Sequence, residues 1–338
     1  MKTIHWGLIG CGDIAVKRVA PAMRDLESHS IRAIARRDTG RLEEFAARFP
    51  VERLYQKAEE LIADPEVDAV YLATPVNLHL EHTLLAAQAG KHVLCEKPMA
   101  LDTAQCDKMN EACEKAGVLL GVAYYRRFYP AVLKIKEILT EGEIGRPVLA
   151  RALAAEFWKF PDDHPLAWRI RPEEGGGGPL MDFGSHRIDI LLDTLGPVRE
   201  VSAFTDRLLF ERQVEDSASL LLRHSSGAHS LAGAYHTIGP LCDELEVFCS
   251  AGSLTLKSLN SGSLTITRGN EREILELPPH SNLHLPLLED FGRAIAGRRQ
   301  PRVTGRIGRE TSRIMEAAYR SSREGMVCKI ESNGLTED

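Results

Sequence analysis

The sequence has no uninterrupted apolar run of about 18 residues, which is the length that a membrane-spanning helix needs. The apolar run at residues 3–9 breaks into a glycine-containing segment with an aspartate, and so predicts a first strand rather than a signal peptide. No sustained basic block is present and the net charge is −6, which argues against a nucleic-acid partner. We therefore expect a cytoplasmic globular protein with no membrane partner.

A disulfide or zinc framework is also missing. The seven cysteines are scattered along the chain, and their number is odd. Cys106 and Cys113 are spaced too irregularly for a zinc pattern, and the HExxH pattern of zinc enzymes is absent. We expect free thiols in a reducing compartment and no metal site.

The first 124 residues alternate short apolar strands with helical patterns. Strands are expected at residues 3–9, 31–35, 69–73, 92–95 and 118–122, and helices at 16–26, 40–49, 58–62, 78–90 and 104–116. This alternation predicts βαβ crossovers, and therefore a doubly wound, mostly parallel sheet of the Rossmann type in an α/β domain. The length of 338 residues leaves room for about two domains.

From residue 125 to residue 338 the pattern changes. Longer strands separated by short turns are expected at 148–157, 198–205, 214–223, 229–236, 244–249, 253–259 and 263–267, with helices at 130–141, 179–195, 286–296 and 308–324. The pattern predicts an α+β domain with an open, mostly antiparallel sheet. Its uncovered face favours a homo-oligomer, a dimer or a tetramer, over a monomer with a polar outer face. The last helix could pack back on the first domain.

The most informative motif directly follows the first strand, at residues 10–15 (Gly-Cys-Gly-Asp-Ile-Ala). Gly10 permits a tight turn, Gly12 lets the backbone approach a pyrophosphate, and Ala15 allows close packing of helix on strand. Backbone N–H groups at the start of the next helix favour an anion. The motif predicts a dinucleotide site, and the alternative is an ordinary glycine turn.

The end of the second strand bears on which nicotinamide cofactor is bound. An NAD site places an acidic residue there to hold the ribose hydroxyls. Here the strand ends in Arg36 and Arg37, and Arg41 follows one helical turn later. Guanidinium groups suit a 2′-phosphate, so NADP is predicted in preference to NAD. In the alternative, Asp38 takes the acidic role, the arginines are solvated and NAD is bound.

Two segments carry residues suited to proton transfer. Lys97 follows the strand at 92–95, at the sheet edge that faces a cofactor in this fold, and it could polarise a carbonyl or shuttle a proton. Asp182, His186 and Asp189 have the spacing of one helical face, and histidine suits acid–base chemistry near neutral pH. Taken alone, either segment could equally be a surface feature.

These motifs, in this order, resemble the glucose–fructose oxidoreductase and inositol dehydrogenase family, called Gfo/Idh/MocA. The matching segments are residues 10–15, 73–79, 96–98, 177–189 and 316–325. The resemblance implies a Rossmann domain (1–124), a second domain with an open sheet (125–338), and hydride transfer between a nicotinamide and a hydroxyl or ketone carbon of a sugar or polyol. It also implies that His186 moves the proton, assisted by Lys97 and Asp182. Arg36 stands where the inositol dehydrogenases have an acid, as in NADP-preferring relatives.

The motifs and the resemblance together define the expected site. Cofactor contacts are expected from Gly10, Cys11, Gly12, Asp13, Ile14, Arg36, Arg37, Arg41, Thr74, Pro75, Asn77, His79, Glu96 and Lys97. Substrate contacts are expected from Tyr125, Arg127, Trp168, Arg169, Asp182 and His186. Two other functions stay open: a redox-neutral glycosidase that holds NAD, and a nucleotide-sensing protein without turnover.

Overall fold

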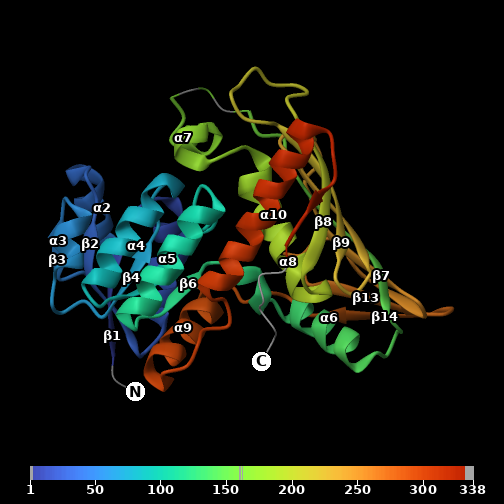
Figure 1. Ribbon diagram of the computed structural model, residues 1–338. Coiled ribbons are helices and arrows are strands. Elements are labelled where there is room, and N and C mark those ends of the chain that lie inside the picture. Colours follow the sequence, from blue (N-terminus) through green and yellow to red (C-terminus); the bar gives the residue numbers. More distant parts are fainter. Residues whose placement is uncertain (1–2, 160, 162, 332–338) are drawn as a thin grey trace. The chain divides into compact units, whose positions relative to one another are not determined.

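A computed structural model describes residues 3–159, 161 and 163–331, which form two compact units (Figure 1). The first unit contains the chain up to Tyr125 together with His280–Glu310, and the second contains Arg126–Pro279 and the chain from Thr311 onward. A domain is a part of the chain that could fold alone, and compactness by itself does not show this. The predicted domain boundaries, 1–124 and 125–338, therefore stay predictions.

The first unit is built on a six-stranded parallel sheet with the order β3-β2-β1-β4-β5-β6. Its strands are β1 (Ile4–Ile9), β2 (His29–Ala35), β3 (Arg53–Tyr55), β4 (Ala69–Leu72), β5 (His92–Cys95) and β6 (Leu120–Val122). This is the strand order of a dinucleotide-binding Rossmann fold, and the prediction of a doubly wound sheet is confirmed. Only β3 was not predicted, because three residues are too few to show a period.

Helices cover both faces of this sheet, which explains why its strands are continuous apolar runs. They are α1 (Ala20–Asp25), α2 (Thr39–Arg48), α3 (Ala58–Ile62), α4 (His79–Gln88), α5 (Thr103–Ala116) and α9 (Leu285–Gly297). On one face the ring of Trp6 lies 5.9 Å from that of Phe291 in α9. The next residue, Gly7, faces the other way, and a Cβ there would overlap Leu61 of α3.

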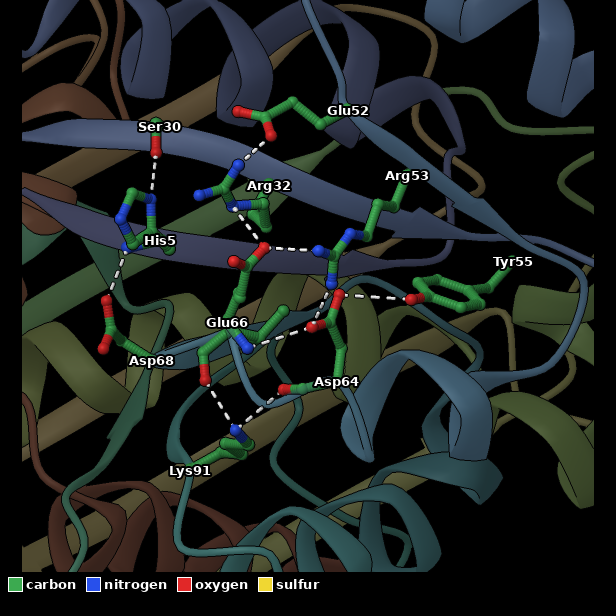
Figure 2. A network of polar contacts seen from close by, with 11 residues as sticks. His5, Ser30, Arg32, Glu52, Arg53, Tyr55, Asp64, Glu66, Asp68 and Lys91 are labelled. Carbon is green, nitrogen blue, oxygen red and sulfur yellow. Dashed lines mark hydrogen bonds and ion pairs between the residues drawn. The ribbon is translucent and has the colours of Figure 1, made fainter.

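A network of ion pairs and hydrogen bonds closes the amino-terminal edge of the sheet (Figure 2). Arg53 donates to Asp64 at 2.6 Å, Tyr55 donates to the same carboxylate at 3.1 Å, and Lys91 donates to the carbonyl oxygens of Asp64 and Val67. Burial works to raise the pKa of Asp64, but these donors and the backbone N–H at position 66 outweigh it and lower the pKa. The network joins the start of β3 to the loop that leads into β4.

The second unit contains a nine-stranded sheet with the order β14-β13-β12-β11-β7-β10-β9-β8-β15. Its strands are β7 (Pro147–Ala155), β8 (Val198–Asp206), β9 (Ser217–His224), β10 (His229–Tyr235), β11 (Cys242–Cys249), β12 (Gly252–Leu256), β13 (Ser263–Arg268), β14 (Glu271–Glu276) and β15 (Cys328–Lys329). All described pairs are antiparallel except β7 with β10, so the predicted open, mostly antiparallel sheet is confirmed. The sequence did not reveal β14, whose charged side chains hide the alternation, or the two-residue β15.

Helices α6 (Pro130–Glu141) and α8 (Ser185–Leu195) pack together, and α8 contacts β7 and β10. The short α7 (Pro172–Gly175) and the long α10 (Gly305–Glu324) complete the helices. The single helix predicted over residues 179–195 is wrong in one respect. Residues Leu180–Gly184 form a π-helical turn and α8 begins only at Ser185, so Asp182 does not lie in the α-helix that carries His186.

The glycine run at 175–178 lies before this turn and is shaped by close packing. The Glu215 carboxylate accepts hydrogen bonds from the backbone N–H groups of Gly178 and Leu180 and from the Tyr319 hydroxyl, at 3.0–3.1 Å. A Cβ on Gly177 would overlap Tyr319, and one on Gly178 would overlap the carbonyl oxygen of Glu215. A cavity of about 630 Å³ adjoins this loop, and its lining contains none of the predicted site residues.

The outer face of the nine-stranded sheet carries large apolar side chains. Register pairs Leu221 of β9 with Leu231 of β10, and these side chains are 48% and 41% exposed. Phe204 and Phe248, on the same face, are 72% and 39% exposed. In the part of the chain that is described, no helix has the length and apolarity to cross a membrane.

Candidate active site

The glycine loop lies at the carboxyl end of β1, and its shape depends on Gly10. This residue has a φ of 91°, and a Cβ there would lie 2.5 Å from the carbonyl oxygen of Ala73, so only glycine fits. At Gly12, by contrast, no described atom outside its chain neighbours lies within 4 Å of the Cβ position. Open space at Gly12 and a fully buried Ala15 are what a dinucleotide pyrophosphate requires of such a loop. The loop fits the expected cofactor.

Arg36, at the end of β2, is bound directly to this loop. Its guanidinium donates a hydrogen bond to the carbonyl oxygen of Cys11, and its backbone N–H donates to the Tyr55 carbonyl oxygen at 3.0 Å. Cys11 itself is buried, and burial raises the pKa of its thiol to about 12 although Arg36 acts in the opposite direction. The loop therefore carries a neutral thiol beside a permanent positive charge.

Asp38 caps the following helix. Its carboxylate accepts the backbone N–H of Arg41 at 3.1 Å, and the Arg41 guanidinium lies 3.8 Å away. A carboxylate that caps α2 already has a structural role. This arrangement weakens the alternative in which Asp38 holds the ribose, and it leaves the exposed Arg37 and the loop-bound Arg36 as the charges nearest the end of β2.

His79, at the start of α4, holds two loops of the carboxyl edge together. Its Nδ1 lies 3.1 Å from the carbonyl oxygen of Pro98 and 3.2 Å from that of Met99, and its Nε2 lies 3.0 Å from that of Thr74. The ring is buried, and burial lowers its pKa although the three carbonyl contacts act to raise it. His79 thus braces the loops that follow β4 and β5, and the predicted Lys97 lies in the second of these loops.

Glu96 anchors the backbone of Lys97. Its buried carboxylate accepts hydrogen bonds from the Tyr71 hydroxyl at 2.6 Å and from the Lys97 N–H at 3.1 Å, and lies 3.4 Å from His284 Nε2. Burial works to raise the pKa of Glu96, but the contacts with His284 and Tyr71 outweigh it and lower the pKa. The His284 ring in turn lies 4.6 Å from that of Tyr125. Tyr71 and His284 were not identified from the sequence, since neither lies in a recognisable motif.

Asp182 and His186 stand at the junction of the π-helical turn and α8. Arg169 donates to the Asp182 carboxylate at 3.2 Å, and Ser185 Oγ donates to the Asp182 carbonyl oxygen at 3.1 Å. His186 is buried, with 5% of its surface exposed. The second unit therefore presents a carboxylate and an imidazole one turn apart, which is the set required for proton transfer.

Arg127 lies in the 3₁₀ turn Tyr125–Phe128 and belongs to a buried cluster of charges that includes two aspartates of α8. Its guanidinium lies 2.8 Å from Asp189 and 2.9 Å from Asp193, and Lys136 lies 2.6 Å from Asp193. Burial raises the pKa of Asp189 to about 6, although Arg127 acts to lower it. These contacts anchor α8, and the substrate role expected of Arg127 stays a prediction.

An aromatic cluster surrounds Arg169, the partner of Asp182. The Arg169 guanidinium lies 5.6 Å from the ring centres of both Trp158 and Trp168. The ring of His236 lies 4.6 Å from Trp158 and 4.9 Å from Phe183. The site residues expected from the sequence did not include Trp158, Phe183 and His236. The available signal for His236 was a histidine at the end of a strand of alternating apolar residues.

The remaining expected cofactor residues lie on the same sheet edge. Asp13 and Ile14 continue the glycine loop, and Pro75 and Asn77 follow β4. Within the described residues, no group of three or more histidine, cysteine, aspartate or glutamate side chains could hold a metal ion.

A dinucleotide-binding sheet, in a chain that also contains an open-sheet domain with an aspartate and a histidine four residues apart, defines a class, the two-domain nicotinamide-dependent oxidoreductases. The family profile described as "Oxidoreductase family, NAD-binding Rossmann fold" matches residues 4–124, and the "GFO/IDH/MocA C-terminal domain" matches residues 132–255. The chain belongs to the Gfo/Idh/MocA oxidoreductase family.

Similar proteins cover almost the whole chain. A 1,5-anhydro-D-fructose reductase of Ensifer adhaerens is 32% identical over 97% of this chain and 99% of its own length. A myo-inositol 2-dehydrogenase of Thermotoga maritima is 30% identical over 96% and 98%. The solved structure of an oxidoreductase from Agrobacterium radiobacter with NAD+, L-tartaric acid and magnesium has a TM-score of 0.88 and 27% identity, over 97% and 98%. The protein is therefore an oxidoreductase that uses a nicotinamide cofactor.

Proposed function

We propose that the protein is a cytoplasmic, NADP-preferring dehydrogenase or reductase that interconverts a hydroxyl and a ketone on a sugar, polyol or related compound. The observation that carries the cofactor preference is Arg36, which is bonded to the glycine loop at the end of β2 while Asp38 is occupied as a helix cap. The sugar-like substrate is supported by the similarity to a reductase of 1,5-anhydro-D-fructose and a dehydrogenase of myo-inositol.

The residues that would hold the cofactor follow from the sheet edge. The pyrophosphate would bind the backbone at Gly10–Ile14. The 2′-phosphate would bind the side chains of Arg36, Arg37 and Arg41. The nicotinamide half would lie against residues 74–79, Glu96 and Lys97. Once bound, the nicotinamide supplies a hydride acceptor or donor.

The protein's own side chains manage the proton. In the oxidation, His186 takes the hydroxyl proton as the carbinol carbon loses its hydride, and the C–O bond becomes a ketone. The Lys97 ammonium stabilises the negative charge that develops on that oxygen, and Asp182 orients the imidazole and binds substrate hydroxyls. Tyr125, Trp168 and Arg169 complete the substrate contacts in this proposal. Reduction reverses each transfer.

A panel assay tests this function. Sugars, polyols and keto sugars, including 1,5-anhydro-D-fructose and myo-inositol, are incubated with each cofactor in both directions, and NADPH is followed by its absorbance. We expect turnover with tighter binding of NADP than of NAD, and loss of turnover in His186→Ala. Hydrolysis of an aryl glycoside with no net change in cofactor would favour a glycosidase. Nucleotide binding without any turnover would favour a sensor.

We also propose that two copies of the chain associate through the outer face of the nine-stranded sheet. The support is the apolar surface formed by Phe204, Leu221, Leu231 and Phe248, which a monomer would leave in water. Light scattering after size exclusion should give a dimer or a larger even assembly, and Leu221→Asp should shift it toward monomer. A monomeric wild-type protein would contradict the proposal.

A further inference from the structure

His236 follows β10 and is held rigidly in the second unit. Its backbone N–H donates to the Asp216 carbonyl oxygen at 2.8 Å, and its own carbonyl oxygen accepts the Trp158 N–H at 2.9 Å. The residue has no exposed surface, and its ring lies against those of Trp158 and Phe183. The imidazole therefore has a fixed position and a fixed set of neighbours.

Arg212 determines which nitrogen of this ring carries the proton. Its Nη2 lies 3.0 Å from His236 Nδ1. A guanidinium has donors only, so Nδ1 must accept this hydrogen bond, and the proton of the neutral ring lies on Nε2. Burial lowers the pKa of His236 to about 3, although the nearby Asp182 acts to raise it. At neutral pH the ring is thus a neutral imidazole with one N–H group.

That N–H group has no acceptor in the described part of the chain. Among the residues that the structure describes, Nε2 of His236 is buried and makes no hydrogen bond. Native proteins satisfy nearly all such buried groups, and an exception calls for a reason. The surroundings supply a reason. The His236 ring contacts the rings of Phe183, which follows Asp182 in the chain, and of Trp158, over which the Arg169 guanidinium lies. Asp182 and Arg169 are the hydrogen-bonded pair that we propose to bind the substrate.

We propose that His236 is a substrate-binding residue whose Nε2–H donates a hydrogen bond to a hydroxyl or carbonyl oxygen of the sugar-like substrate. The assignment rests on the proposed function and deepens it. His236 selects substrates that carry an oxygen at one particular position, because a substrate without it leaves the buried donor unsatisfied. Arg212 is a positioning residue that acts through the tautomer of His236. His236 is not a second proton carrier, since its second nitrogen is occupied by a guanidinium.

Two substitutions separate the nitrogens of the ring. His236→Asn places an amide near the Nδ1 position and keeps a partner for Arg212, whereas His236→Gln places an amide N–H near the Nε2 position. We expect Asn to raise KM for the turned-over substrate about tenfold or more, with a smaller change in kcat, and Gln to restore part of the loss. The deoxy analogue that lacks the bonded oxygen should show equal KM values for the wild type and His236→Asn.

A matched control comes from the same sheet. His224 is equally buried, but both of its ring nitrogens have partners, at 2.8 Å from the Gly196 carbonyl oxygen and 2.8 Å from Ser230 Oγ. His224→Asn should lower the melting temperature and leave KM as in the wild type. Affinity for NADP, measured by titration of each folded variant, should not change in either variant.

The outcomes separate this inference from the proposed function. Turnover with an unchanged KM in His236→Asn would overturn the inference and leave the function standing. If no compound of the panel is turned over, the function fails, and myo-inositol and 1,5-anhydro-D-fructose are titrated against tryptophan fluorescence, because Trp158 adjoins His236. The inference that His236 donates to the ligand would be supported if the wild type and His224→Asn show saturable quenching and His236→Asn does not. The inference would be overturned if both variants show the quenching, or if the wild type shows no quenching.

Discussion

The two edges of the parallel sheet use polar side chains in opposite ways. At the amino-terminal edge, the charges of Arg53, Asp64 and Lys91 are partnered by other groups of the protein (Figure 2). At the carboxyl edge, Glu96 and His79 are also satisfied internally, but they hold the backbone of loops. The first edge joins elements to each other, whereas the second fixes the loops that carry the expected cofactor residues.

The difference follows from the topology of parallel sheets. All six strands run the same way, so every loop that follows a strand lies on one edge, and ligands bind at that edge. Charges on the opposite edge are free to serve folding alone. The comparison teaches that similar ion pairs in one domain should respond differently to substitution, in activity at one edge and in stability at the other.

The strongest test of this contrast is Lys97→Ala, at the carboxyl edge. In the proposed mechanism Lys97 assists proton transfer, so its loss should lower kcat/KM by about 10²- to 10⁴-fold. The melting temperature should stay close to that of the wild type, because Glu96 accepts a hydrogen bond from the backbone N–H of residue 97, which alanine keeps. Lys97→Arg, which keeps the charge, serves as the control. A variant that melts early while retaining its specific activity would break the comparison.

The second test is Arg36→Ala, at the same edge. In the proposed function Arg36 binds the 2′-phosphate, so its removal should weaken NADP binding by about 10- to 100-fold, because hydrogen bonds between charged groups are strong. NAD binding should change much less, since NAD lacks the 2′-phosphate. Both dissociation constants are measured by calorimetric titration. Arg24→Ala, an exposed arginine at the end of α1 that pairs with Asp25, is the matched control. Equal losses for both cofactors would mean that Arg36 only supports the glycine loop.

At the carboxyl edge the structure agrees with the sequence in the glycine loop. Gly10 lies in a short motif whose backbone shape depends on neighbours in sequence, so the pattern was sufficient to predict the turn. The role of Lys97 stays a prediction. Glu96 was expected to contact the cofactor, but its partners Tyr71 and His284 are separated from it along the chain and give no local signal.

Longer-range effects were harder to predict. The helix predicted over 179–195 is helical throughout, but the sequence did not reveal that its first turn, which contains Asp182, is π-helical, because a π-helical turn has the same apolar pattern as an α-helix over so few residues. His236 has a tautomer that depends on Arg212, in the loop before β9, a relation that no spacing rule contains. Non-local partners, rather than local propensities, account for what the sequence left out.

The third test is Asp64→Asn, at the amino-terminal edge. It should lower the free energy of unfolding by about 1–3 kcal/mol, because a buried carboxylate with three donors loses its charge. The dissociation constant of NADP should not change. Urea unfolding followed by circular dichroism gives the first quantity, and titration gives the second. A weakened cofactor site in a folded Asp64→Asn protein would erase the distinction between the edges.

The same variant makes a prediction about pH. The pKa of Asp64 is lowered in the folded protein, so its ionised form contributes stability above the unfolded pKa of about 4. That contribution is lost as the pH falls through the folded pKa, when the carboxyl group is protonated. The difference in unfolding free energy between wild type and Asp64→Asn should therefore shrink below about pH 4. A difference that stays constant down to acid pH would show that Asp64 acts through shape rather than charge.

The smallest effect is expected for Glu52→Gln, also at the amino-terminal edge. Glu52 pairs with Arg32, but its side chain is 65% exposed, and Arg32 has a second partner in Glu66 at 3.7 Å. Water screens an exposed pair, so the free energy of unfolding should change by no more than about 0.5 kcal/mol, and less at high salt. The measurement is the same urea titration at two salt concentrations, beside Asp64→Asn. A loss as large as that of Asp64→Asn would mean that the network acts as one cooperative unit, so that burial of the individual partner does not decide its contribution.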